Sequence, residues 1–166
     1  MNLAIIYYSE TGHTQTKGEQ IAEGMKKQGA EVRMFNLKDG QPDKEYIESC
    51  AGIVFGTPTY YASTCWQLKK FFDADSSGIK LAGKLGGVYA TANWAQGGAD
   101  VANLTIVGHM LVKGMLAYSS GGEYGKPIVH LGPTALVNEA DCFDNSKELF
   151  EIYGERFAKK AKELFD

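Results

Sequence analysis

Several features that mark familiar protein classes are scarce or missing in this chain. No apolar run approaches the length of a membrane span, and the N-terminus lacks the basic region and apolar core of a signal peptide. The net charge is only −3 with no basic stripe, which argues against nucleic-acid binding. The three cysteines form no Cys-x-x-Cys pair, so we expect reduced thiols in a cytoplasmic protein. The three histidines are equally scattered, and we expect no metal site.

Two common phosphate-binding patterns are also absent. The chain has neither the Gly-x-Gly-x-x-Gly pattern of dinucleotide-binding sites nor the Gly-Lys-Ser/Thr loop of NTPases. Both classes of site are therefore disfavoured. Its length of 166 residues, with 44% hydrophobic and 22% charged residues, is typical of one globular domain, which we place over residues 1–166.

The strongest positive signal follows the first predicted strand. Residues 3–8 form an apolar, β-favouring run, and helix-forming residues begin after a polar turn. The free amides of a helix N-terminus attract an anion, and this turn adds three hydroxyls and a glycine. A simple helix cap is the alternative, but a cap needs only one such residue. We therefore predict a loop for a terminal phosphate, as in a mononucleotide cofactor, formed by Ser9, Glu10, Thr11, Gly12, His13 and Thr14.

The rest of the chain alternates predicted helices and strands. In order, these are helix 15–28, strand 31–36, a short helix near 43–49, strand 51–56, helix 66–75, strand 83–90, helix 99–112, strand 114–119, an irregular region 121–144 with a short strand considered at 127–131, and helix 146–165. This pattern predicts a parallel sheet of five strands with helices on both faces. We expect inward positions for Trp66, Phe71, Phe72, Val101, Leu104, Ile106, Val107 and Leu111.

Two further loops follow the third and fourth predicted strands. Loops after parallel strands gather at one sheet edge, where ligands bind. Flat aromatic walls and close backbone amides suit a flavin ring, so together with the phosphate loop these loops favour FMN. Taken alone, Tyr60 and Tyr61 fit an ordinary surface loop as well as a flavin site, and Trp94 fits equally well as a rim residue under a partner subunit. The predicted ring-binding residues are Pro58, Thr59, Tyr60, Tyr61, Thr91, Ala92, Asn93, Trp94, Gln96, Gly97 and Gly98.

These motifs resemble the three FMN-binding loops of the flavodoxin-like family, over essentially the whole chain. The segment 58–98 more closely resembles the NAD(P)H:quinone oxidoreductase branch related to the tryptophan-repressor-binding flavoprotein. There a Thr-Pro-Thr-aromatic loop, a Phe-x-Asp helix (residues 71–73) and a Gly-Lys-Leu strand (residues 83–85) recur in that order. The resemblance implies an α/β flavodoxin-like three-layer sandwich with sheet order 2-1-3-4-5, and FMN held non-covalently.

The chain departs from that branch in two places. The branch typically enters its fifth strand with His-His-Gly-Met, whereas residues 112–115 here read Val-Lys-Gly-Met, so no histidine role is carried over. The chain is also shorter, without room for the extra segment associated with the branch's tetramer. Electron-carrier flavodoxins, in turn, are usually far more acidic than this chain.

Three functions remain open at this point. Our first hypothesis is an FMN enzyme that takes electrons from NAD(P)H and reduces a quinone, flavin or similar acceptor, with no catalytic side chain because the flavin carries the reaction. The second is an electron carrier that docks to redox partner proteins, and the third is a flavin-binding regulatory module. A homodimer would cover apolar residues that the third loop and residues 121–144 otherwise leave over an open site.

Overall fold

The computed structural model describes residues 1–166 and contains one parallel sheet of six strands. The strands are β1 (Asn2–Tyr7), β2 (Glu31–Asn36), β3 (Gly52–Pro58), β4 (Leu85–Ala92), β5 (Leu116–Ala117) and β6 (Thr134–Leu136). Their order is β2-β1-β3-β4-β5, with β6 also paired to β4. The predicted order 2-1-3-4-5 is confirmed, and β6 is an addition to the five predicted strands.

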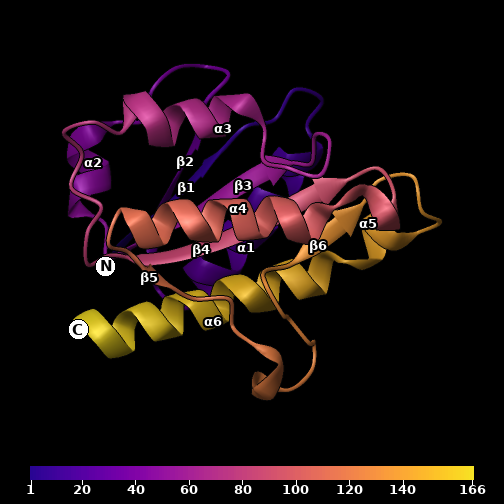
Figure 1. The fold of residues 1–166 in the computed structure, drawn as a ribbon. Coiled ribbons are helices and arrows are strands. Elements are labelled where there is room, and N and C mark those ends of the chain that lie inside the picture. Colours follow the sequence, from indigo (N-terminus) through magenta and orange to yellow (C-terminus); the bar gives the residue numbers. More distant parts are fainter.

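Helices cover both faces of this sheet (Figure 1). On one face lie α1 (His13–Lys27) and α6 (Lys147–Phe165), and on the other lie α2 (Lys44–Ser49), α3 (Trp66–Lys70) and α4 (Ala99–Val112). A π-helical turn (Phe71–Asp75) extends α3, and the short α5 (Cys142–Asn145) precedes α6. The predicted three-layer arrangement is therefore confirmed.

The sheet has a separate core on each side because alternate residues of its strands point in opposite directions. Leu3 and Ile5 of β1 point toward α1 and α6, where they meet Phe150 and Phe157. The alternate residues, such as Ile6, point into the other core, toward α2, α3 and α4. Because β1 is buried on both faces, it reads as a continuous apolar run in the sequence.

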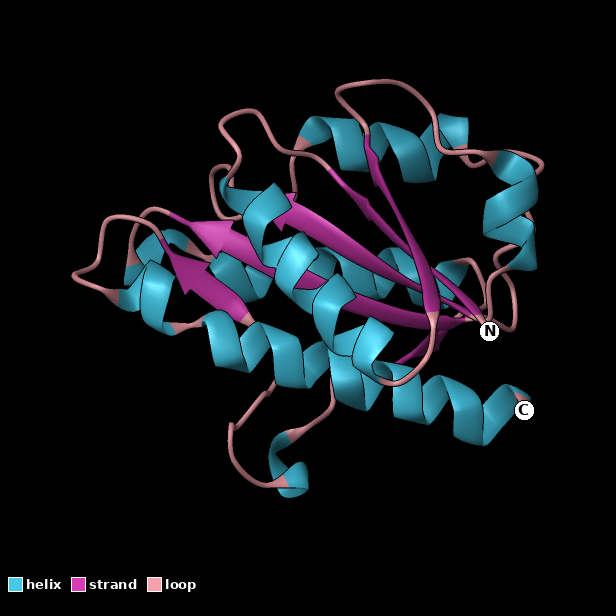
Figure 2. Cartoon of the chain, turned by 180° about the vertical axis from the view of Figure 1, so that it is seen from behind, coloured by secondary structure: helices cyan, strands magenta, loops and turns pink.

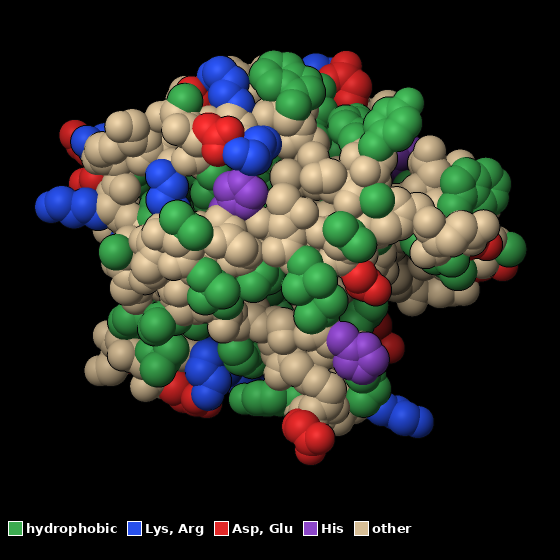
Figure 3. Space-filling view, viewed as in Figure 1, with side chains coloured by type: hydrophobic (Ala, Val, Ile, Leu, Met, Phe, Trp, Pro, Cys, Tyr) green, Lys and Arg blue, Asp and Glu red, His purple; other side chains and the backbone are tan.

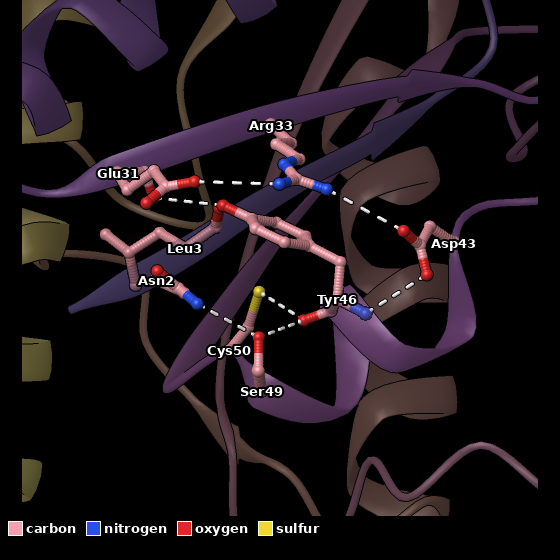
Figure 4. A network of polar contacts seen from close by, with 8 residues as sticks. All are labelled: Asn2, Leu3, Glu31, Arg33, Asp43, Tyr46, Ser49 and Cys50. Atoms are coloured by element: carbon pink, nitrogen blue, oxygen red, sulfur yellow. Dashed lines mark hydrogen bonds and ion pairs between the residues drawn. The ribbon is translucent and has the colours of Figure 1, made fainter.

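A polar network fastens α2 to the amino ends of β1 and β2 (Figure 4). Asp43 caps α2 by accepting a hydrogen bond from the amide of Tyr46 at 3.2 Å. The Tyr46 hydroxyl donates to the carbonyl oxygens of Leu3 and Glu31, at 3.1 and 3.2 Å. This network lies at the end of the sheet opposite to the loops that carry the predicted site, so it is structural.

The edge position beside β4 is divided between two short strands (Figure 2). β5 pairs with residues 85–86 of β4 and β6 pairs with residues 90–92. Between β5 and β6 the chain leaves the sheet over residues 118–133, an excursion with a 3-10 turn at Gly122–Tyr124. The predicted strand 114–119 is thus shortened to two residues. The strand considered at 127–131 is wrong, because β6 forms after Pro133 instead.

Several side chains expected in the core are exposed. Phe71 and Phe72 are buried as predicted, but Trp66 lies at the surface. In α4, Ile106 is buried, whereas Val101, Leu104 and Leu111 are exposed because they occupy the side of the helix that faces away from the sheet. No helix has both the length and the hydropathy needed to cross a membrane.

Candidate functional site

A cavity of about 240 Å³ lies at the carboxyl ends of β1, β3 and β4. It brings together residues from all three predicted loops. Its lining consists of Ser9, Glu10, Thr11, His13, Thr14, Pro58, Thr59, Tyr60, Thr91, Ala92, Asn93 and Val137. Eleven of these twelve were predicted from the sequence, and Val137 was not.

The first loop presents backbone donors that no protein group uses. Gly12, with φ of 97°, stands immediately before α1 in the left-handed region that favours glycine. The Ser9 hydroxyl accepts hydrogen bonds from the amides of Gly12 and Gln15, both at 3.2 Å. The amides of Glu10, Thr11, His13 and Thr14 have no protein acceptor. Four free N–H groups at the N-terminus of a fifteen-residue helix have the arrangement that attracts an anion.

Glu10 is the one carboxylate that lines the cavity, and two neighbours hold it. The Tyr8 hydroxyl donates to its Oε2 at 2.6 Å, and Lys38 Nζ lies 3.2 Å from its Oε1. The hydrogen bond from Tyr8 and the charge of Lys38 lower the pKa of Glu10. The same hydrogen bond raises the pKa of Tyr8 to about 12. The Glu10 carboxylate is therefore bonded to Tyr8 and Lys38 and does not accept hydrogen bonds from the free amides of the loop, which remain available for an anion.

Asn36, at the end of β2, holds the first loop from its other side. Its Oδ1 accepts a hydrogen bond from the Ser9 amide at 3.1 Å, and its Nδ2 donates to the Ser9 carbonyl at 3.2 Å. The loop is thus fastened at both polar groups of the Ser9 backbone, which fixes its shape before any ligand binds.

The second loop makes a tight turn after β3. Tyr60 and Ser63 exchange two backbone hydrogen bonds of 3.1 Å, and Tyr61 and Ala62 between them have φ values of 48° and 58°. Two successive residues in the left-handed region are typical of a type I′ hairpin turn. The Tyr61 ring is fully exposed and does not line the cavity, whereas Tyr60 does. The Thr59 hydroxyl oxygen is buried in this loop without a hydrogen-bond partner.

The third loop begins later than predicted because β4 extends through Ala92. Thr91, Ala92 and Asn93 line the cavity. The predicted residues Trp94, Gln96, Gly97 and Gly98 lie outside its lining. Gly98 instead contacts the second loop, since a Cβ built on it would lie 2.5 Å from the Ala62 Cβ. The second and third loops therefore pack against each other at their tips.

A fourth segment, residues 137–145, borders the cavity, and none of its residues was predicted as a binding residue. The amides of Val137 and Asn138 donate to the carbonyls of Ala92 and Asn93, at 2.8 and 3.0 Å. Phe143 packs on His13 of the first loop, with ring centroids 5.3 Å apart. The sequence analysis placed an irregular region, residues 121–144, over the open site together with the third loop, but it named none of these residues as binding residues and did not predict their pairing with β4.

The donor set fits the parts of FMN. Free amides and neutral hydroxyls suit a phosphate monoester, and the unpartnered Thr59 hydroxyl can hydrogen-bond a ligand in the cavity. The half-exposed rings of Tyr60 and Trp94 stand at the second and third loops, where a flat ring system would need apolar walls.

Comparison with known proteins also points to a protein that binds FMN. The family model for flavodoxin matches residues 5–98. A flavodoxin from Clostridium saccharobutylicum is 46% identical over 166 residues, which is 99% of this chain and 100% of that protein. An NAD(P)H dehydrogenase (quinone) from Geobacter sulfurreducens is 29% identical over 154 residues, 74% of this chain and 75% of that protein.

A solved structure agrees in fold. The flavodoxin, WrbA-like protein from Agrobacterium tumefaciens superposes with a TM-score of 0.78 at 24% identity, covering 98% of each chain. The sheet order, the two helical layers and the cavity at the strand ends define a flavodoxin-like α/β sandwich. With nearly half of its residues shared over the full length of the Clostridium protein, the chain belongs to the flavodoxin family. That family binds FMN.

Proposed function

We propose that this protein holds FMN in the strand-end cavity and uses it to carry electrons to and from redox partner proteins. The main support for FMN binding is the set of four unpartnered amides at the start of α1, which donate hydrogen bonds to the phosphate. The Thr11 and Thr14 hydroxyls lie on the same loop, and the flavin ring lies between Tyr60 of the second loop and Asn93–Trp94 of the third. FMN, when bound, supplies the electron-accepting ring, and the chain positions it and excludes water from one side.

The carrier role is supported by the full-length similarity to a flavodoxin and by the charge around the cavity. The fourth segment, residues 137–145, contains three carboxylates and no Lys or Arg. None of the three, Glu139, Asp141 and Asp144, takes part in an ion pair. We infer that these three carboxylates, which lie in the segment that borders the cavity, steer a basic partner surface toward the flavin.

A second candidate is an FMN-dependent NAD(P)H:quinone oxidoreductase. The similarity to NAD(P)H dehydrogenases (quinone) and the fully exposed Tyr61 ring favour it. A planar nicotinamide or quinone would stack near this ring and the half-exposed Trp94. Such an enzyme needs no acid or base from the protein because the flavin itself carries the reaction.

The FMN assignment is tested by comparing FMN with riboflavin, which lacks the phosphate. We expect the purified protein to bind FMN at least about 100-fold more tightly than riboflavin, since charge-assisted hydrogen bonds to phosphate each contribute about 1.5–3 kcal/mol. Quenching of flavin fluorescence measures both affinities. Equal affinity for the two flavins would contradict the phosphate site at α1.

The choice between carrier and enzyme is tested on the FMN-loaded protein under anaerobic conditions. A carrier shows two resolved one-electron steps in a potentiometric titration and oxidises NADH and NADPH no faster than free FMN does. An enzyme oxidises one of them rapidly when a quinone is added. Neutralising the fourth segment with Glu139→Gln, Asp141→Asn and Asp144→Asn slows electron transfer from a basic reductase only if the carrier role is correct.

A further inference from the structure

One side chain of the fourth segment reaches across to the third loop. The Ala95 amide donates a hydrogen bond to Glu139 Oε1 at 3.2 Å. Glu139 is half-buried, whereas Asp141 and Asp144, the other two carboxylates of the segment, are exposed. Of the three acidic side chains, Glu139 is therefore the one that is fixed to the rest of the chain.

This contact falls where the backbone pairing between β4 and β6 ends. The last strand pair is Ala92 with Leu136. Two further hydrogen bonds, donated by the amides of residues 137 and 138 to the carbonyls of residues 92 and 93, continue the pairing at 2.8 and 3.0 Å. With the same offset, Glu139 stands opposite Ala95. There the backbone of the fourth segment turns away into α5, and the Glu139 side chain supplies the acceptor that the backbone no longer offers.

The hydrogen bond caps a short turn within the third loop. Ala95–Gly97 forms a 3-10 turn, and Trp94, which precedes it, provides no side-chain cap. Glu139 caps the turn from outside, because Ala95 is its first residue. The amides of residues 93, 94, 96 and 98 have no acceptor within the chain. The third loop thus offers free amides and the half-exposed Trp94 ring to a ligand, in a shape that Glu139 fixes.

We propose that Glu139 is a positioning residue for the flavin ring, which holds the third loop in the shape that receives FMN. The inference rests on the proposed FMN site and adds to it a residue that does not line the cavity. Trp94 lies between Asn93 and Ala95, and both of these are bonded to the fourth segment. A loop that is ordered before its ligand arrives loses less conformational entropy on binding, so this fastening raises the affinity for the ring.

No cation competes with the Ala95 amide for the Glu139 carboxylate. Glu139 takes part in no ion pair, and its segment contains no Lys or Arg. The third loop and the fourth segment lie side by side at the right of Figure 1, and Figure 3 shows hydrophobic and acidic side chains without basic ones on this projecting edge. Hydrogen bonds to a carboxylate are stronger than those to a neutral acceptor, which suits a contact that holds a surface loop.

The proposal is tested by comparing FMN with riboflavin, because the two flavins share the ring and differ in the phosphate. Glu139→Ala removes the acceptor at the ring end and leaves the phosphate loop intact. We expect the affinities for both flavins to fall by the same factor, about fivefold, so that their ratio stays that of the wild type. Quenching of flavin fluorescence measures both affinities. The visible absorption spectrum of bound FMN should also shift, because the surroundings of the ring change.

A conservative variant separates the hydrogen bond from the charge. Glu139→Gln keeps an oxygen acceptor for the Ala95 amide and removes the charge, so it should regain most of the affinity and the wild-type spectrum. Glu148→Ala is the matched control, since Glu148 is exposed, has no hydrogen bond or ion pair, and lies in the first turn of α6. It should bind both flavins as the wild type does. Thermal unfolding of each variant shows that it remains folded.

Three results would overturn the positioning role of Glu139. Wild-type affinity for both flavins in Glu139→Ala would do so and would leave the FMN site itself standing. A loss of affinity for FMN with none for riboflavin would place the effect at the phosphate end. Equal losses in Glu139→Gln and Glu139→Ala would assign the effect to charge. A wild-type protein that binds neither flavin would instead overturn the proposed function together with this inference.

Discussion

The Thr14 and Thr91 hydroxyl oxygens lie 2.8 Å apart and join the start of α1 to the end of β4. Both side chains are buried, so this hydrogen bond forms away from solvent. It is a direct side-chain link between the proposed phosphate loop and the loop expected to hold the flavin ring. The distance between the two ends of the cofactor site is therefore set partly by this pair.

Thr91→Val tests that link, because valine keeps the shape of threonine and removes its hydroxyl. The Thr14 hydroxyl is then left buried without its partner, and we expect a loss of about 1–2 kcal/mol in the free energy of unfolding of the protein without FMN. Urea unfolding measures it. Thr105→Val, at a hydroxyl on the more exposed surface of α4, is the control and should change stability by less than about 0.5 kcal/mol. Equal losses in both variants would remove any special role from the buried pair.

Gly98→Ala tests the contact between the second and third loops. Gly98 has φ of 86°, and a Cβ on it would lie 2.5 Å from the Cβ and 2.7 Å from the Cα of Ala62. The new methyl group must push the turn at Tyr61 and Ala62 away, so we expect FMN affinity to fall by about tenfold and the free energy of unfolding by about 1–3 kcal/mol. Fluorescence titration and urea unfolding measure the two effects.

The neighbouring glycine provides the control for that substitution. Gly97 is not in the left-handed region, and a Cβ on it would meet only the Ala92 Cβ, at 3.7 Å. Gly97→Ala should therefore keep both the FMN affinity and the stability of the wild type. A comparable loss of affinity in Gly97→Ala would mean that chain flexibility in the third loop, rather than the contact with Ala62, governs binding.

The parts of this site that could be predicted are those governed by local chemistry. A parallel strand that is buried on both faces is a continuous apolar run, so β1 and β3 can be recognised in the sequence. The polar residues that follow each run then identify the loops. Parallel pairing then brings the loop ends together without any further information. The lining of the cavity by Ser9, Thr14, Thr59 and Thr91 follows from these two facts.

The parts that could not be predicted depend on long-range packing. Periodicity cannot say which side of α4 faces the sheet, because the helix is apolar on all sides, and Leu104 and Leu111 were therefore assigned inward. β6 has only three residues and forms because the edge of β4 beyond residue 86 is free. Val137 reaches the cavity only as a consequence of that pairing.

Lys17 provides a test based on pH. Its ammonium is buried, donates to the carbonyl of Phe143 and to Gln20, and has no carboxylate partner. Burial lowers the pKa of Lys17 in the folded protein. The unfolded chain therefore binds more protons over the interval between the two pKa values, and the contribution of Lys17 to stability rises as pH increases toward 10.5, the ordinary lysine pKa.

Lys17→Met removes the charge and keeps much of the length of the side chain. We expect the difference in free energy of unfolding, wild type minus variant, to shift in favour of the wild type as pH rises from neutral toward that value. Urea unfolding of both proteins across the interval measures it, and effects of other titrating groups cancel in the difference. Lys26→Met, on the exposed side of α1, should show no such trend. A flat difference for Lys17→Met would mean that its ammonium is hydrated in the folded protein.

Arg156 of α6 holds the excursion between β5 and β6 without any carboxylate. Its Nη1 donates to the Ser120 hydroxyl at 3.1 Å and to the Pro127 carbonyl at 3.0 Å. Its Nη2 donates to the carbonyls of Gly125 and Lys126, at 3.3 and 3.0 Å. Four acceptors around one planar group require the geometry of a guanidinium, which an ammonium cannot reproduce.

Arg156→Lys keeps the charge and loses that geometry, so we expect a loss of about 2 kcal/mol in the free energy of unfolding and faster hydrogen exchange in the excursion. Mass spectrometry of exchanged peptides should show the increase over residues 118–133, with the strands and α1 unchanged. Arg33→Lys is the control, because Arg33 is half-exposed and its ion pairs with Glu31 and Asp43 measure 3.8 and 3.7 Å. If Arg156→Lys instead speeds exchange evenly through α1 and α6, then Arg156 supports the packing of those helices and not the excursion alone.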